Sequence, residues 1–183
     1  MPNRRDPDHA GRGGDPAPAH GALSDLPWEL PHRFLGLDEE ASAFDTSDAV
    51  ILPVPYESTT SYGGGAKAGP GAILEASRFI DLYDQEFDLE PAPRHGVHTL
   101  PSVELTRAGA EAAMAELRHV HDRVLEAAGE RFVLMLGVVH SVSAPAIRSH
   151  AARHDARLTV LQFDAHADLR PEYEGSPWSH ASA

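Results

Sequence analysis

The chain has 183 residues, of which 42% are hydrophobic and 23% are charged, a composition typical of one folded domain with a sizeable core. Its formal net charge of -13 argues against nucleic-acid binding, which needs a basic surface, and favours a metal ion or a small basic molecule as partner. The absence of cysteine excludes disulfides, thiolate catalysis and zinc sites built from cysteine.

Residues 1–25 are predicted to form a disordered tail. They are mostly Pro, Gly, Asp, Arg and His, so burial cannot offset the entropy cost of ordering them. The early arginines are not followed by the apolar run of a signal peptide, and no stretch reaches the roughly 18 to 20 apolar residues of a membrane span. We therefore expect a cytoplasmic protein that does not contact the membrane, with a single domain over residues 26–183.

Strands and helices are predicted to alternate from residue 49 onward. Residues 49–54 form an apolar run typical of a strand buried on both faces, and a long glycine-rich loop then leads to a helix from Pro70 to about Leu82. The remaining predictions are an edge strand at 97–100, a helix at 108–128, a buried strand at 132–136 and a helix at 143–153. This alternation predicts an α/β fold with a mainly parallel sheet.

Residues 158–170, LTVLQFDAHADLR, are the stretch around which we expect a site to form. The first six residues predict a strand, and Asp164, His166 and Asp168 follow it. If the chain stays extended, these alternate side chains project to one side and converge on one point. His140 follows the preceding strand, and sites in parallel sheets form at the carboxyl ends of the strands. The sequence therefore predicts a metal site built from His140, Asp164, His166 and Asp168.

The ligand types narrow the choice of metal. Two imidazoles and two carboxylates favour Mn²⁺ or Mg²⁺ over structural zinc, although zinc stays open. A carboxylate can bridge two ions about 3.5 to 4 Å apart, and such a pair would generate hydroxide from a shared water at neutral pH. His180, in the run YEGSPWSH, is a candidate proton carrier. The pattern assigns no substrate-binding residue.

Four motifs, in this order, resemble the ureohydrolase family of arginases and agmatinases, and most closely the prokaryotic agmatinases. They are PYESTTSYGGGAKAGPGAI (residues 55–73), G-x-x-H-S (137–141), D-A-H-A-D (164–168) and Y-E-G-S-P-W-S-H (173–180). The resemblance implies a three-layer α/β/α fold, a binuclear manganese centre and hydrolysis of a guanidinium group. Agmatine would yield putrescine and urea, a reaction of polyamine biosynthesis. The resemblance also implies a small cationic guanidino substrate and a homo-oligomer.

The resemblance further implies a role for each site residue. His140, Asp164 and Asp168 would hold one ion, His166 would hold the other, and Asp164 would bridge them. Asp168 and His180 would be catalytic, with His180 as the proton shuttle. The loop over residues 56–65 would lie near the substrate channel.

Two departures from the family pattern qualify these expectations. Val138 stands where the family usually has a glycine, and Val139 replaces a carboxylate that could orient a ligand. The family's later Asp-x-Asp motif has no counterpart in the sequence, so we expect a C-terminally truncated chain with an incomplete sheet and little activity by itself. The alternatives are a truncated non-catalytic relative, or another amidinohydrolase such as a guanidinobutyrase or an arginase-like enzyme.

Overall fold

A computed structural model of the chain describes residues 32–58, 60 and 62–183; the tail predicted for residues 1–25 lies outside this range, as do residues 26–31. The helices and strands are β1 (Ala49–Pro53), α1 (Gly69–Ser77), α2 (Pro91–His95), β2 (Val97–Thr99), α3 (Ala110–Ala128), β3 (Phe132–Leu136) and α4 (Ser143–Arg153). Short 3-10 helices are η2 (Phe34–Gly36), η3 (Ala66–Ala68) and η4 (His140–Val142). None of the helices in the described ranges is both long and apolar enough to cross a membrane.

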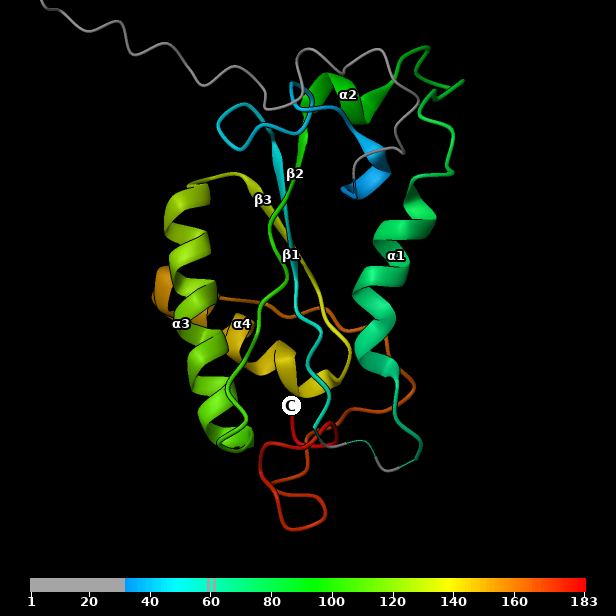
Figure 1. Cartoon of the computed structure of the whole chain (residues 1–183). Coiled ribbons are helices and arrows are strands. Elements are labelled where there is room, and N and C mark those ends of the chain that lie inside the picture. Colours follow the sequence, from blue (N-terminus) through cyan, green and yellow to red (C-terminus); the bar gives the residue numbers. More distant parts are fainter. Residues whose placement is uncertain (1–31, 59, 61) are drawn as a thin grey trace, which may run out of the picture.

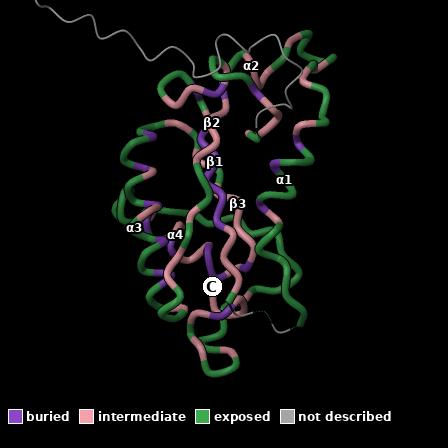
Figure 2. The backbone as a smooth tube through the Cα atoms, viewed as in Figure 1, coloured by how far each residue is buried: buried purple, intermediate pink, exposed green. Residues whose placement is uncertain are grey.

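The described strands form one three-stranded parallel sheet in the order β2-β1-β3. β1 lies in the centre, with Ala49 opposite both Val97 and Phe132. The side chains of Val50, Ile51 and Leu52 are at most 2% exposed, which confirms the prediction of a strand buried on both faces. Figure 2 shows this as a buried stretch along β1, whereas the outer faces of the helices are exposed. The predicted α/β fold with a parallel sheet and the edge strand β2 are confirmed as well.

Helices cover the sheet from two sides. Figure 1 shows α3 and α4 on one side of the strands and α1 on the other, the α/β/α arrangement that the resemblance implied. The apolar stripe of α3 packs on the sheet because its residues recur at helical spacing. The resulting core cluster consists of Leu52, Val54, Ala113, Met114, Leu117, Val139 and Val142.

Two local predictions in the first half of the chain need correction. α1 ends at Ser77 and not near Leu82, because the N–H groups of residues 78–80 bond to carbonyls three residues back and tighten the chain into turns. Phe79 and Ile80 beyond it are consequently exposed. Between the helix predicted to about Leu82 and the edge strand predicted from residue 97, where the sequence predicts no regular element, lies the five-residue helix α2. It begins at Pro91, because proline is favoured at the start of a helix, and ends at a glycine with φ +72°.

The strand predicted over residues 158–163 is wrong. The segment carries no sheet hydrogen bonding, and Val160, Leu161 and Phe163 are 53%, 78% and 91% exposed. In the part of the chain that the structure describes, β3 pairs with β1 along one edge and has no strand on the other. Phe132 of β3 is accordingly 66% exposed, so β3 is less buried than the sequence predicts. An apolar pattern typical of a strand therefore does not produce a strand by itself. The segment also needs neighbouring elements that pair with it and cover it.

Candidate metal centre

His140 is held by the packed part of the molecule. The chain leaves β3 at Gly137, where a Cβ atom would lie only 2.5 Å from a methyl group of Val142, so the tight turn requires glycine. Val139 is 8% exposed and belongs to the core cluster, and Val138 packs against the same cluster. The two valines that depart from the family pattern therefore attach the turn to the core, and η4 begins at His140 directly after them.

The two carboxylates come from a loop without regular structure. Oδ1 of Asp164 accepts the backbone N–H of His166 at 2.8 Å, which bends the chain at residues 165–166. Asp168 has φ +51°, a left-handed conformation that is uncommon for a residue other than glycine. These two features, and not an extended strand, direct both aspartates toward His140.

Three predicted ligands meet in one group. Nδ1 of His140 lies 2.7 Å from Oδ2 of Asp168 and 4.0 Å from Oδ2 of Asp164, and one donor atom of each residue lies within 4.8 Å of the other two. Ligands about 2.1 Å from a hard divalent cation are about 3 Å apart at right angles and about 4 Å apart across the ion. The three donors therefore fit one such cation after small adjustments of the side chains.

His166 does not join this group, so the expectation that residues 164, 166 and 168 converge on one point is wrong. Its side chain is 81% exposed, because the bend after Asp164 breaks the alternation that an extended chain would have. Its Nδ1 atom nevertheless lies 4.0 Å from Oδ1 of Asp164, while Oδ2 of the same carboxylate faces His140 at 4.0 Å. Asp164 thus stands between two imidazoles, with one oxygen toward each.

The surroundings of Asp164 favour its ionised form. The hydrogen bond from the backbone N–H of His166 is the main cause that lowers the pKa of the Asp164 carboxyl, and the nearby imidazoles of His140 and His166 lower it further. A carboxylate in this state is ready to bind a cation at neutral pH, because no proton has to leave first.

His180 lies on the same hairpin as Asp168. Residues 168–183 fold back on themselves, with Leu169 paired antiparallel to Ser182 and Tyr173 to Ser176. Glu174 and Gly175 between them both have positive φ, as in a tight two-residue hairpin turn. The ring of His180 packs edge-on against Tyr173 with centroids 5.4 Å apart. The role of His180 as proton shuttle stays a prediction.

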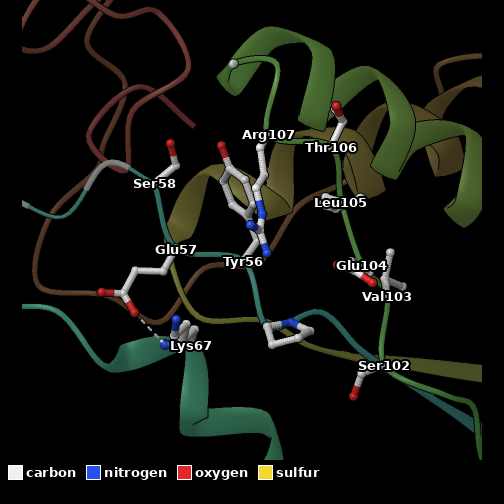
Figure 3. Close-up of a pocket in the computed structure, with 12 residues that line it drawn as sticks. Tyr56, Glu57, Ser58, Lys67, Ser102, Val103, Glu104, Leu105, Thr106 and Arg107 are labelled. Atoms are coloured by element: carbon white, nitrogen blue, oxygen red, sulfur yellow. Dashed lines mark hydrogen bonds between the residues drawn. The ribbon is translucent and has the colours of Figure 1, made fainter.

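A pocket of about 700 Å³ opens at the carboxyl end of β1 (Figure 3). One wall is the start of the loop that the resemblance places near a substrate channel, with Tyr56, Glu57 and Ser58. The other wall is residues 102–107, which sequence reasoning did not select; the available signal was their position after the predicted strand 97–100. Glu57 accepts the N–H groups of Gly65 and Lys67, and the bond from Lys67 is the main cause that lowers the pKa of Glu57.

The pocket and the candidate metal centre lie at the same edge of the sheet. β1 and β3 are parallel and in register, with Pro53 opposite Leu136. The pocket residues follow the end of β1, and the turn to His140 follows the end of β3. In open α/β sheets this edge is where ligands bind.

Comparison with known proteins identifies the family. Residues 47–183 match the family model described as the Arginase family, and the chain belongs to that family. Among curated relatives, it is 37% identical over 145 residues to N(1)-aminopropylagmatine ureohydrolase of Thermus thermophilus, a match that covers 79% of this chain and 48% of the relative. It is 31% identical over 159 residues to agmatinase of Pyrococcus horikoshii, covering 83% of this chain and 52% of the relative.

Comparison with a solved structure supports the same family fold. Proclavaminate amidino hydrolase from Streptomyces clavuligerus is similar with a TM-score of 0.69 and 26% sequence identity, over 85% of this chain and 50% of that one. The resemblance drawn from the four motifs and the arginase-like fold class are thereby confirmed. The chain spans about half the length of the curated relatives it matches.

Proposed function

We propose that this chain carries the metal-binding part of a ureohydrolase that hydrolyses the guanidinium group of agmatine, or of its N(1)-aminopropyl derivative, to urea and an amine. The single observation that carries the proposal is the meeting of His140 with Asp164 and Asp168 from a separate segment, at the sheet edge where ligands bind. The family of the chain and the activities for which its relatives are named support the substrate class.

Two manganese ions are the proposed cofactor. His140, Asp164 and Asp168 would hold the first ion, and His166 the second. The position of Asp164, with one oxygen toward each imidazole, supports a bridging role. When bound, a pair of such ions supplies a water of lowered pKa as nucleophile at neutral pH.

The protein's own groups would position the substrate and move protons. The carboxylate of Asp168 would orient the reacting groups by accepting a hydrogen bond, and a ring nitrogen of His180 would carry a proton to the departing amine. The formal net charge of -13 favours a cationic substrate. In the pocket, we expect the ammonium end of the substrate near Glu104, whose carboxylate accepts no hydrogen bond from the residues that the structure describes.

A second candidate is a non-catalytic relative of the family. Val139, which is buried in the core where the family pattern has a carboxylate, favours it. A guanidino acid as substrate is the remaining alternative within the hydrolase class.

Urea release distinguishes these candidates. The assay compares the 183-residue chain with a chimera that adds the part of the Thermus relative that has no counterpart here, both loaded with Mn²⁺, on agmatine, N(1)-aminopropylagmatine, 4-guanidinobutyrate and arginine. We expect urea from the chimera with the two agmatines and none from its Asp168→Asn variant. A folded chimera that binds Mn²⁺ but releases no urea from any of the four would reject the hydrolase in favour of the non-catalytic relative.

A further inference from the structure

The segment that precedes Asp168 does not determine its position. The left-handed backbone of Asp168 is unfavourable for a residue other than glycine, so its surroundings must hold it. The preceding segment is exposed and forms no sheet pairing. The carboxylate of Asp168 contacts His140, and the groups that hold its backbone follow it in the chain.

The hairpin over residues 168–183 supplies backbone hydrogen bonds at that point. The N–H of Ala183 donates to the carbonyl oxygen of Asp168 at 3.0 Å, and the N–H of Arg170 donates to the carbonyl of Ala181 at 3.2 Å. An isolated two-stranded hairpin is at best marginally stable in water. Leu169 on its first arm is 79% exposed, so this arm contributes little packing.

The second arm is attached to the core by Trp178 and Ser179. Trp178 packs against the core cluster and lies beside Met114 of α3 and Pro145 of α4, which line a small cavity with it. The guanidinium of Arg148 on α4 sits 5.3 Å above its indole ring. Ser179 is 2% exposed, and its hydroxyl accepts the N–H of Ala181 at 3.3 Å.

We propose that Trp178, held by Arg148, is a positioning residue that fixes the hairpin on α3 and α4 and thereby sets Asp168 within reach of His140. The order of contacts is continuous: the core holds Trp178, the second arm continues from it to Ala183, and Ala183 holds the backbone of Asp168. The proposal rests on the proposed function in one respect, namely that Asp168 is a metal ligand.

The test measures the stability of the hairpin and the affinity for the metal separately. Amide hydrogen exchange of Arg170 and Ala183 reports the hairpin without any metal, and titration followed by electron paramagnetic resonance gives the affinity for Mn²⁺. In Trp178→Ala we expect both amides to lose protection and Mn²⁺ to bind about 10- to 100-fold more weakly, the range typical for loss of a group that orients a ligand. Trp178→Phe keeps an aromatic ring, so it should retain most of the amide protection and most of the affinity for Mn²⁺.

Arg148→Met and Phe79→Ala extend the comparison. Arg148→Met keeps an unbranched, flexible side chain but removes the charge above the indole, and we expect about two- to fivefold weaker binding of Mn²⁺. Phe79 is 80% exposed at the end of α1, and its loss should change neither readout. If Trp178→Ala is too unstable to measure, Trp178→Phe and Arg148→Met decide the question with the same two readouts.

The two proposals fail in different ways. Protected amides together with unchanged Mn²⁺ affinity in Trp178→Ala, or in Arg148→Met where Trp178→Ala does not fold, would overturn the positioning role and leave the metal site standing. A wild-type chain that binds no Mn²⁺ would overturn the metal site, and the exchange of Arg170 and Ala183 would then decide whether Trp178 holds the hairpin.

Discussion

Two apolar runs of similar length differ in burial: one is buried in the sheet and the other is exposed. Residues 49–54, AVILPV, form the buried central strand, whereas residues 158–163, LTVLQF, are exposed and unpaired. The first run has strands on both edges and helices on both sides of the sheet, as Figure 1 shows. The second has no strand beside it in the described part of the chain. Apolar composition therefore marks a segment that can be buried, and its neighbours decide whether it is.

The candidate metal centre lies across the boundary between these two regions. His140 follows the buried part of the sheet and is tied to it through Val139 and η4. Asp164 and Asp168 follow the exposed run and depend on a bend and on the hairpin. One of the three ligands thus follows directly from the core, and the other two are held mainly by contacts with residues that come after them in the chain.

The largest effect on stability is expected from a substitution in the core, which we compare with a separate substitution at an exposed residue. Leu117→Ala removes a side chain of α3 that is fully buried in the core cluster and should lower the free energy of unfolding by about 4 kcal/mol. Phe163→Ala removes a larger side chain that is 91% exposed, and it should change that free energy by less than about 0.5 kcal/mol. Urea denaturation measures both. A comparable loss in the two variants would show that residues 158–163 are buried in solution.

Acid should weaken the buried region through His121. This residue is 2% exposed, and its Nδ1 atom has no hydrogen-bond partner among the residues that the structure describes. Burial together with the neighbouring His150 lowers its pKa to about 4, against the opposing effect of Asp122. The unfolded chain takes up this proton near pH 6.5, so the folded state should lose about 3 kcal/mol as the pH falls from about 6.5 to 4. His121→Phe should remove this part of the pH dependence. Equal slopes in the two proteins would contradict the assignment.

A smaller effect is expected where the two regions join. Gly137→Ala would place a methyl group 2.5 Å from Val142 and should cost about 1 to 3 kcal/mol by overpacking. Because η4 carries both Val142 and His140, the imidazole should also move. The double variant Gly137→Ala with Val142→Ala makes room for the methyl group, so its loss should be less than the sum of the two single losses in thermal unfolding. Strictly additive losses would argue against the contact.

The smallest effect is local. Glu57→Gln removes the charge that accepts the N–H groups of Gly65 and Lys67 at the start of η3. We expect faster amide exchange at these two positions and no measurable change in global stability, since the loop is exposed. A carboxyl titration of Glu57 by NMR should give a pKa below the ordinary value. Unchanged exchange would show that the carboxylate does not organise the loop.

Sequence reasoning found those parts of the molecule that local pattern determines. β1, α3 and α4 follow from hydrophobic spacing, and His140 follows from its place after a strand. It missed what depends on distant contacts: the exposure of residues 158–163, the bend that turns His166 away, and the left-handed backbone of Asp168. It also passed over residues 102–107, because residues that line a pocket without forming a helix or strand leave no periodic pattern in the sequence.

The central claim is that His140 shares one ion with the aspartates of a separate segment. Pulsed electron paramagnetic resonance on the chain with one equivalent of Mn²⁺ detects directly whether a histidine nitrogen is coordinated. We predict a nitrogen coupling in the wild-type chain that disappears in His140→Ala and persists in His166→Ala. A coupling that survives the loss of His140, or that vanishes with His166 alone, would contradict the shared site.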